Sequence, residues 1–298
     1  METTRCGVIA VVGRPNVGKS TLMNALVREH LSITSSKPQT TRHRVLGVIT
    51  ETVKNTPTQF IFVDTPGFQT KHSNALNKTM NRAVMTALAD VHAVLWVVEQ
   101  GKLTSADTRV LELCPQHVPL IAVVNKVDML KDKGLVLPFL QKVADLRSFA
   151  AVVPLSAESA LNLDALKEAL STTLPEQAFY YDEDMLTDRP EKFLAAERIR
   201  EKLFRLVGDE LPYTCTVVID RFVIEEGRRM IHASILVDRA SHKAMIIGKG
   251  GEKLKRIASE ARQDMERLFD GSVHLETWVK VRGGWADNAS VLQTLGYD

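Results

Sequence analysis

The sequence predicts an α/β protein with a doubly wound, mostly parallel sheet, followed by a smaller α+β domain. Short apolar runs have the length of buried strands, and they lie at 7–13, 58–64, 91–98, 118–125 and 150–156. Stretches with helical periodicity separate these runs, at 19–28, 75–89, 104–114, 131–149 and 162–173. Strands that alternate with helices are typical of a parallel sheet with helices on both faces.

The pattern changes after residue 174. The segment Leu174–Pro190 is acidic, carries a proline near each end and has no clear period, which is typical of a linker. Beyond it the order becomes helix, strand, strand, helix, strand, at 192–207, 214–224, 229–239, 251–269 and 273–281. We therefore expect one domain over 1–174, a linker over 175–190 and a second domain over 191–298.

Composition fits this division. A length of 298 residues suits two domains, and 45% hydrophobic with 25% charged residues is typical of a soluble globular protein. The cysteines Cys6, Cys114 and Cys215 are far apart and odd in number, so we expect reduced thiols in a cytosol. The apolar run at 7–13 is too short for a signal peptide or a membrane span. Net charge is +2, and acids balance bases from Asp184 onward, so any RNA site must come from local clustering.

The first motif is GRPNVGKS, Gly13–Ser20, between a predicted strand and a predicted helix. Backbone amides of such a loop surround a β-phosphate, and Lys19 neutralises charge on the outer phosphates. The Ser20 hydroxyl is suited to a magnesium ion. The alternative is a glycine turn of a Rossmann-like loop, which the flanking strand and helix disfavour.

Further motifs follow the later strands. DTPG, Asp64–Gly67, ends a strand, where an acid can hold magnesium through water and the Gly67 amide can sense the γ-phosphate. Alone this tetrapeptide is often just a turn, so its position after the loop carries the interpretation. NKVD, Asn125–Asp128, follows the strand PLIAVV. An aspartate there accepts from the ring N–H and the exocyclic amine of guanine, and buried hydrogen-bond readers discriminate by ~10⁴ to 10⁵, so we expect GTP rather than ATP.

These motifs occur in order at the carboxyl ends of predicted strands, where α/β sheets bind ligands. Together with PQTTRHR at 38–44, the loop GRPNVGKS resembles the Era family of P-loop GTPases. Ser156 and Ala157 resemble the base-supporting loop of GTPases. The resemblance implies these nucleotide-binding residues: Gly13, Arg14, Pro15, Asn16, Val17, Gly18, Lys19, Ser20, Thr21, Asp64, Thr65, Pro66, Gly67, Asn125, Lys126, Val127, Asp128, Ser156 and Ala157.

The polar segment 32–44 is the expected place for a loop ordered by γ-phosphate and magnesium. The resemblance implies Thr41 as the second magnesium hydroxyl, beside Ser20 and Asp64, while Thr40 remains the alternative because sequence does not set the register. The expected catalytic residues are Lys19, Thr41 and Gly67. The alternative is an exposed polar loop whose threonines have no functional role.

Hydrolysis is expected to be slow. Many GTPases place a glutamine after the DTPG glycine to orient water, but this chain has Phe68, and Gln69 is shifted by one residue and is assigned no role. Another means of stabilising the transition state is then needed. By resemblance to related GTPases, Asn16 helps to bind a potassium ion that substitutes for an arginine finger.

In the second domain, IIGKGGEKLKR at 246–256 places Gly248 and Gly251 before a helix. This resembles the GxxG loop of type II KH domains, which lets a nucleic-acid backbone approach closely and grips about four nucleotides. The helix carries an apolar stripe of Leu254, Ile257, Ala258, Ala261, Met265, Leu268 and Phe269. Basic residues gather around the loop against one acid, Glu252; they are Arg239, Lys243, Lys249, Lys253, Lys255 and Arg256.

The RNA-binding residues implied by the KH resemblance are Ile247, Gly248, Lys249, Gly250, Gly251, Lys253, Lys255 and Arg256. A lone GxxG is weak, and basic residues often form only a solvated face. Trp278 and Trp285 near the end could stack on bases, but packing is the favoured interpretation. The pattern WVKV…GWA with a closing LGY also resembles the Era family, so the resemblance spans nearly the whole chain.

Family resemblance implies a monomeric, cytoplasmic protein that binds GTP and GDP with Mg²⁺ and K⁺. It implies binding to the 3′ end of small-subunit ribosomal RNA and to the 30S subunit during ribosome assembly. It also implies peripheral association with the inner membrane, although we find no lipid-binding segment in the sequence. Two rivals stay open: a P-loop kinase, which NKVD disfavours, and an RNA-binding protein whose nucleotide site is only structural.

Overall fold

The computed structural model describes residues 3–35, 37, 40–68, 75–130, 132–208 and 211–294. Contacts divide the chain into two compact units. The first comprises 1–32, 41–72 and 77–188, and the second comprises 189–298 together with 33–40 and 73–76. Part of the polar segment 32–44 therefore clusters with the second unit.

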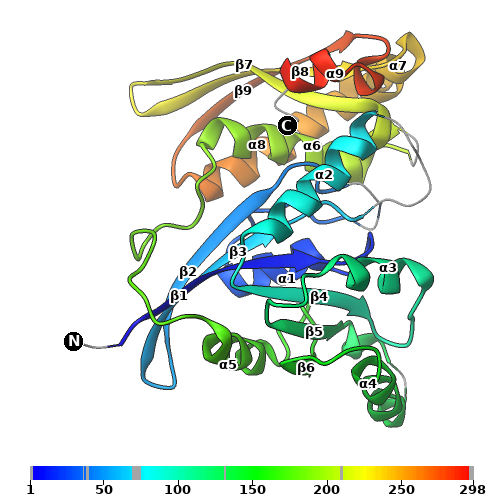
Figure 1. Cartoon of the computed structure of the whole chain (residues 1–298). Helices are drawn as coiled ribbons and strands as arrows, with labels where there is room; N and C mark the ends of the chain where they lie inside the picture. Colours follow the sequence, from blue (N-terminus) through cyan, green and yellow to red (C-terminus); the bar gives the residue numbers. More distant parts are fainter. Residues whose placement is uncertain are drawn as a thin grey trace. The chain divides into compact units, whose positions relative to one another are not determined.

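A six-stranded sheet in the order β2-β3-β1-β4-β5-β6 forms the centre of the first unit (Figure 1). The strands are β1 (Arg5–Val12), β2 (Val45–Val53), β3 (Thr56–Asp64), β4 (Ala93–Glu99), β5 (Leu120–Asn125) and β6 (Ala151–Pro154). β1 runs parallel to β3 and β4, and β4, β5 and β6 continue the parallel arrangement. The carboxyl ends of these parallel strands consequently share one edge, which confirms the expected α/β class.

β2 is an antiparallel edge strand that the sequence analysis did not predict. It pairs with β3 through a tight turn in which Lys54 and Asn55 both have positive φ, 46° and 67°. Its first residues are buried, but its second half, ITETV, is only partly covered. An edge strand with one polar half lacks the continuous apolar run that marked the central strands.

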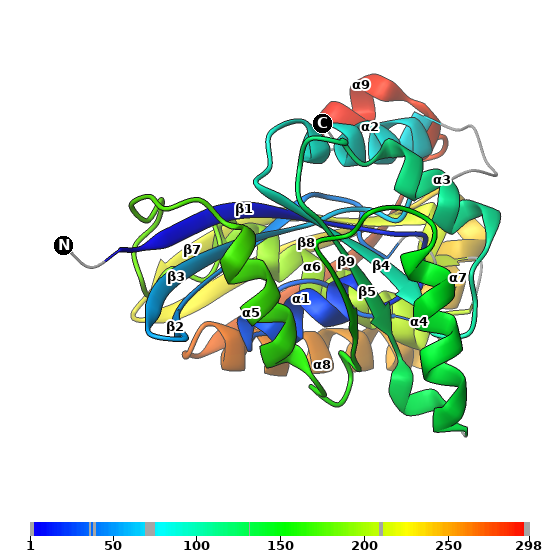
Figure 2. The ribbon, with the colours of Figure 1, turned by 60° about the horizontal axis from the view of Figure 1, so that its bottom comes forward.

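Helices cover both faces of this sheet (Figure 2). They are α1 (Lys19–Val27), α2 (Ala75–Ala89), α3 (Ser105–Leu113), α4 (Val136–Ala144) and α5 (Leu163–Thr173). One core joins α2, α3 and α4 to the sheet through residues such as Val84, Val110 and Phe139. α1 and α5 lie on the opposite face (Figure 2). α4 is shorter than the stretch 131–149: a 3₁₀ turn at Lys133–Leu135 precedes it, and the helix ends at Ala144.

The expected linker is ordered against the first unit. The Gln59 side-chain oxygen accepts hydrogen bonds from the backbone N–H groups of Tyr180 (3.0 Å) and Tyr181 (3.1 Å). The backbone N–H of Val48 donates to the carbonyl of Leu186 at 2.8 Å. These bonds explain why residues as far as Asp188 cluster with the first unit rather than forming a separate connection.

The second unit contains a three-stranded sheet in the order β7-β8-β9. Its elements are α6 (Glu191–Leu206), β7 (Cys215–Glu225), β8 (Arg228–Val237), α7 (Ala240–Ile247), α8 (Glu252–Leu268), β9 (Val273–Val281) and α9 (Ala289–Thr294). β7 and β8 form a hairpin whose two turn residues, Glu226 and Gly227, have positive φ, and β9 runs parallel to β8.

The expected apolar stripe of α8 is confirmed. Ile257, Ala261 and Met265 are fully buried, and they share a core with Ile199 and Leu203 of α6 and with the sheet. α7 was not expected as a helix, because only Ile246 among its residues is buried and it shows no amphipathic period. Among the helices that the structure describes, none is both long enough and apolar enough to cross a membrane.

An ion pair between Lys202 of α6 and Asp264 of α8 joins the two core helices. Burial raises the pKa of Asp264, but hydrogen bonds and charges from Lys202 and Arg267 more than offset this, so the pKa lies below its usual value. We expect Asp264→Asn to lower the free energy of unfolding of the second unit by about 1–3 kcal/mol at neutral pH, since it leaves a largely buried ammonium without a charged partner.

Because the folded-state pKa of Asp264 is lowered, its contribution is complete above the unfolded value of about 3.9 and is lost as the pH falls below that value. Denaturant titration followed by Trp278 and Trp285 fluorescence, in a Trp96→Phe background, measures this difference. The control Glu225→Gln removes an exposed pair with Arg221 and should cost at most about 1 kcal/mol. Equal losses for both variants would contradict the prediction.

Candidate functional site

The phosphate loop joins β1 to α1 at the carboxyl edge of the sheet. Gly18 has φ of +96°, and a Cβ there would lie 2.3 Å from the Asn125 side-chain nitrogen, so only glycine fits. The Lys19 ammonium donates to the carbonyls of Gly13 (3.1 Å) and Arg14 (3.0 Å). The loop therefore curls around the lysine that the sequence singled out.

The Lys19 side chain is buried. Burial lowers its pKa to about 8, although the charge of Asp64 opposes that change. A buried ammonium is stabilised by an anionic partner, and phosphate oxygens can supply that charge. The electrostatics of the loop thus favour a polyphosphate.

Three oxygen-bearing side chains meet beside Lys19. The Ser20 hydroxyl donates to Asp64 Oδ2 at 2.8 Å and lies 2.8 Å from the Thr41 hydroxyl. Thr41 also donates to Asp64 Oδ2, at 3.3 Å. Asp64 Oδ1 is buried and has no hydrogen-bond partner among the described residues. Burial raises the pKa of Asp64, against the opposing effect of Lys19.

This arrangement fits Mg²⁺. Magnesium prefers oxygen ligands and in phosphate sites uses few carboxylates, with phosphates and waters completing its shell. The unpaired Asp64 Oδ1 would gain a partner from such an ion or its water. When bound, the ion would neutralise charge on the β- and γ-phosphate oxygens.

The structure distinguishes the two candidate threonines by position. The Thr40 hydroxyl donates to the Lys37 carbonyl at 2.6 Å, so it is engaged within its own segment. The Thr41 hydroxyl contacts Ser20 and Asp64. The geometry therefore favours Thr41, and its role as a metal ligand remains a prediction.

DTPG lies against the phosphate loop. Thr65 donates to the Val11 carbonyl at 2.8 Å, and a Cβ on Gly67 would come within 2.9 Å of Pro15 Cα. Phe68 is partly buried against the core of the first unit, so its ring contributes packing. Gln69, to which the sequence analysis assigned no role, lies outside the described residues.

The expected base-reading residues, apart from Val127, line one cavity of about 240 Å³. Its lining comprises Gly18, Thr21, Asn125, Lys126, Asp128, Met129, Ser156, Ala157 and Glu158. The Asn125 side chain donates to the Val17 carbonyl (2.8 Å) and accepts from the Ala157 N–H (3.0 Å). Met129 and Glu158 were not predicted, because neither belongs to a motif, although each directly follows a predicted residue, Asp128 or Ala157.

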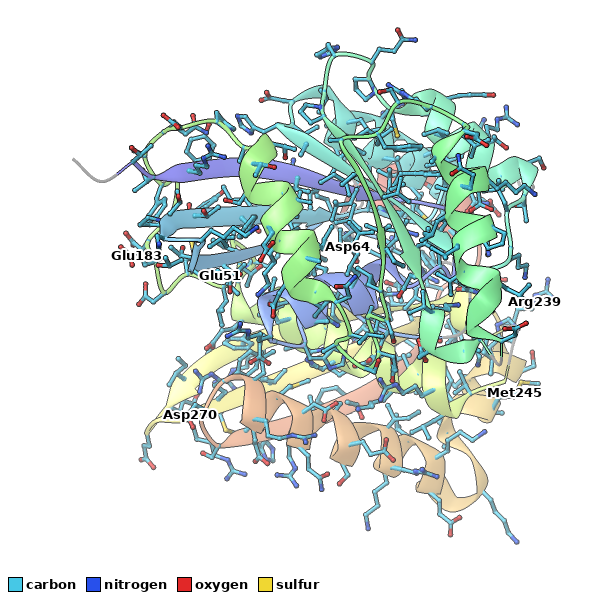
Figure 3. The ribbon with its side chains drawn as sticks, turned by 90° about the horizontal axis from the view of Figure 1, so that it is seen from below. Glu51, Asp64, Glu183, Arg239, Met245 and Asp270 are labelled. Atoms are coloured by element: carbon cyan, nitrogen blue, oxygen red, sulfur yellow. The ribbon has the colours of Figure 1, made fainter. Side chains whose placement is uncertain are left out.

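In the second unit, the GxxG loop separates α7 from α8. Gly248 has φ of +72°, and a Cβ there would lie 2.8 Å from Lys253 Cβ, so glycine is required. Arg239 and Met245 lie at the α7 end of the unit and Asp270 at the far end of α8 (Figure 3). Lys243, Lys249, Lys255 and Arg256 are exposed.

Two charges of the basic cluster are partly neutralised. Arg256 donates to Glu260 at 2.7 Å, and Arg239 lies 3.4 Å from Asp238. The cluster is accordingly less basic than the residue count suggested. Lysines around the GxxG loop are the exposed cations that remain for a phosphate backbone.

The two tryptophans differ. Trp285 is buried and donates to the Thr214 carbonyl at 3.1 Å, as the packing interpretation expected. Trp278 leaves 44% of its surface exposed and meets His232 edge to face, so packing accounts for only part of its ring.

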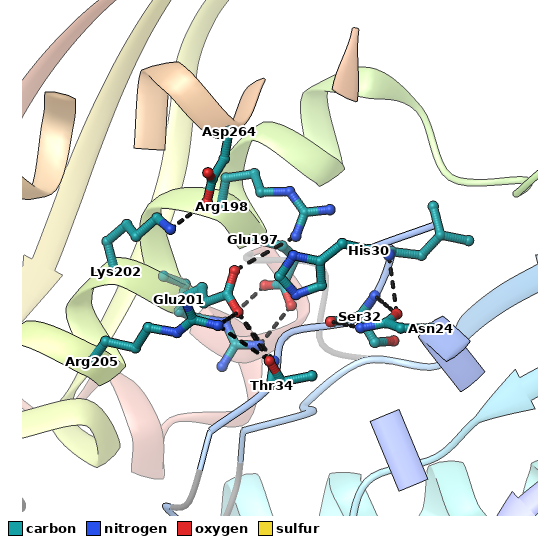
Figure 4. Close-up of polar contacts among 12 residues, drawn as sticks. Asn24, His30, Ser32, Thr34, Glu197, Arg198, Glu201, Lys202, Arg205 and Asp264 are labelled. Atoms are coloured by element: carbon teal, nitrogen blue, oxygen red, sulfur yellow. Dashed lines mark hydrogen bonds and ion pairs between the residues drawn. The ribbon is translucent and has the colours of Figure 1, made fainter. Parts of the chain in front are cut away.

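The polar segment before Thr41 is held by α6 (Figure 4). Thr34 donates its backbone N–H to Glu201 Oε1 at 3.2 Å, and Arg205 donates to both Thr34 Oγ1 and Glu201. Lys37 donates to the Val207 carbonyl at 2.7 Å. The chain then passes from the second unit to the first between Thr40 and Thr41. Ser36, Pro38 and Gln39 lie outside the described residues.

Comparisons with known proteins agree with this geometry. A profile for "50S ribosome-binding GTPase" matches residues 8–126, and one for "KH domain" matches residues 210–286. GTPase Era of Nitrosomonas eutropha is 52% identical over 294 residues, covering 99% of this chain and 98% of that protein. GTPase Era of Neisseria meningitidis is 51% identical and covers 98% and 94%.

Solved structures of Era are also similar to this chain. A variant of Aquifex aeolicus Era bound to GDP and AlF₄⁻ is 35% identical, with a TM-score of 0.93 and 99% coverage of both chains. Era in complex with MgGDPNP and nucleotides 1506–1542 of 16S ribosomal RNA is 36% identical, with the same TM-score and coverage.

Fold and site together define a P-loop GTPase joined to a type II KH domain. The cavity lined by the NKVD and Ser156–Ala157 segments, the phosphate loop and the GxxG loop are each carried by the element expected of that class. The chain belongs to the GTPase Era family.

The choice between Thr40 and Thr41 is testable through magnesium dependence. We expect Thr41→Ala to raise the Mg²⁺ concentration for half-maximal GTP hydrolysis by about tenfold or more, because it removes a hydroxyl beside Ser20 and Asp64. Thr40→Ala is the matched control, with an expected change of less than about twofold. A shift seen only in the Thr40 variant would reverse the assignment.

Proposed function

We propose that this GTPase uses its nucleotide state to control binding of the 3′ end of small-subunit ribosomal RNA by the KH unit, during assembly of the 30S subunit. One observation supports the control step most directly. Residues 33–40 cluster with the KH unit, and the next residue, Thr41, contacts the candidate magnesium ligands. A change at the γ-phosphate and its metal would therefore act on a segment that α6 holds.

Support for the RNA target comes from similarity. Era in complex with MgGDPNP and nucleotides 1506–1542 of 16S ribosomal RNA is similar to this chain over 99% of its length. The exposed lysines around the GxxG loop have the charge that a phosphate backbone requires. We propose Ile247, Gly248, Lys249, Gly250, Gly251, Lys253, Lys255 and Arg256 as the contacts.

In the proposed hydrolysis step, Lys19 holds the outer phosphates while the Gly67 amide contacts the γ-phosphate. Ser20, Thr41 and Asp64 place Mg²⁺. The residue after Gly67 is Phe68, whose ring cannot orient the attacking water, so slow basal turnover is expected.

RNA crosslinking with sequencing tests the proposed function. We expect crosslinks at the 3′ end of 16S ribosomal RNA to be stronger with a non-hydrolysable GTP analogue than with GDP. Gly251→Asp should reduce them about tenfold or more, because it places an anion where the backbone approaches. Gly251 and Gly227 both have positive φ and open space for a Cβ, so Gly227→Asp is a matched control that should bind normally.

Other outcomes separate the rivals. Equal crosslinking with GTP analogue and GDP would favour a nucleotide site that is only structural. A phosphorylated small molecule as product, in place of inorganic phosphate, would favour a kinase. Loss of crosslinks in both Gly251→Asp and Gly227→Asp would mean that an added aspartate lowers RNA binding through its charge or through misfolding, whatever its position.

We also propose that Asn16 takes part in binding a potassium ion that supports catalysis. Asn16 lies in the phosphate loop with φ of 66°, and its carbonyl accepts from Lys126 at 2.8 Å. We expect turnover in potassium chloride to exceed turnover in sodium chloride by about tenfold, and Asn16→Ala to abolish the difference. Equal rates in the two salts for the unaltered protein would remove the idea.

Finer expectations from the family are also proposals. They are a monomeric state and a cytoplasmic location with peripheral association at the inner membrane. Sedimentation of the purified protein, and flotation with vesicles of anionic lipid, would test them.

A further inference from the structure

Four charged side chains meet beside the phosphate loop, and two of them, Glu99 and Asp107, lie outside the motifs. Arg14 comes from the loop, Glu99 from the end of β4, Asp107 from α3 and Lys126 from the NKVD segment. Glu99 is the only one of these positions that no motif and no helix start marks. The Glu99 carboxylate forms ion pairs with both Arg14 and Lys126.

Asp107 is the fixed point of the cluster. Its side chain is fully buried and accepts from the backbone N–H of Thr104 (2.8 Å) and from the Thr104 hydroxyl (2.7 Å), which caps α3. Arg14 Nε lies 3.1 Å from Asp107 Oδ1. One end of the Arg14 guanidinium is thus held by the start of a helix.

Glu99 completes the arrangement by using each oxygen for a different loop. Oε2 lies 2.5 Å from Arg14 of the phosphate loop, and Oε1 lies 3.2 Å from the Lys126 ammonium. Lys126 also donates to the Asn16 carbonyl at 2.8 Å. The backbone of Glu99 pairs with Asn125 in the β4–β5 register, so its carboxylate is placed by the sheet.

The charge state of Glu99 suits this position. Burial raises its pKa, but hydrogen bonds from Arg14 and Lys126 more than offset the effect, and the pKa lies below its ordinary value. The exposed fractions of the side chains are 12% for Arg14, 23% for Glu99 and 28% for Lys126. Partly shielded charge-assisted bonds are stronger than exposed ion pairs.

We propose that Glu99 is a positioning residue for guanine nucleotides, holding the phosphate loop and the guanine-reading segment at a set spacing before the nucleotide arrives. It acts through Arg14 and Lys126. Both loops must contact one ligand at its two ends, so fixing their spacing in advance lowers the ordering cost of binding. The inference rests on GTP binding and is independent of the RNA target.

The test uses the full-length protein with Glu99→Gln, which keeps the shape and removes the charge. We expect the Kd for GTP and GDP to rise about tenfold to hundredfold, mostly through faster GDP release. The kcat at saturating GTP should change less than about threefold, because no contact unique to the transition state is lost. ITP should weaken by the same factor as GTP, since Asp128 still reads the base.

Two further variants are compared with Glu99→Gln. Glu112→Gln makes the same chemical change at an exposed position on α3 and should leave nucleotide affinity unchanged. Asp128→Asn should instead alter the ratio of GTP to ITP affinity, because the exocyclic amine distinguishes the two bases. A changed ratio in the Glu99 variant would mean that it acts on base reading and would overturn the proposal.

A double-mutant cycle with Lys126→Met separates positioning from general stability. Positioning through Lys126 predicts that Glu99→Gln costs clearly less affinity in the Lys126→Met background than in the unaltered protein. Additive losses, or an unchanged GDP release rate in a folded Glu99→Gln protein, would overturn it. If Glu99→Gln fails to fold, Glu99→Asp takes its place. We then expect a smaller effect in the same direction. No effect would count against the proposal. Failure of the unaltered protein to bind GTP would refute nucleotide function itself.

Discussion

The nucleotide site depends on one side chain, Asn125, at the end of a central strand. Its carboxamide donates to the Val17 carbonyl at 2.8 Å and accepts from the N–H groups of Lys126 (2.8 Å) and Ala157 (3.0 Å). Three loops that are far apart in sequence are thereby bound to one planar group. A hydrogen-bonded amide that is almost fully buried tolerates little displacement, so these loops are held in a common geometry.

The charges in the site are arranged on the same principle. Burial acts against ionisation of both Lys19 and Asp64, lowering one pKa and raising the other, while the attraction between the two charges partly offsets each change. Both side chains are buried, so water does little to stabilise their charges. Substrate phosphates and a metal ion bring the charges that this site lacks, and binding can therefore be strong without a large contact area.

Much of this could be predicted from the sequence, because the motifs lie in loops whose positions follow from the strand order. The α/β class, the α8 stripe and the meeting of phosphate and guanine loops needed only periodicity and spacing. α7 was missed because it buries only Ile246 and leaves no period, and β2 was missed because its polar second half interrupts the apolar run. Glu99 was missed for a different reason: a single acid outside the motifs acquires meaning only from neighbours that folding brings near. Glu158 directly follows Ala157 and was missed because the predicted loop ended one residue too early.

The passage of the chain between the units has a consequence for how far they can move. Thr34 is bonded to Glu201 and Thr41 to Asp64. An extended chain spans roughly 3.3–3.6 Å per residue, so the stretch from 34 to 41 reaches about 25 Å at most. Any rearrangement that demands a longer span must first break one of these two anchors. The length of this segment therefore sets an upper limit on the distance between the two anchors.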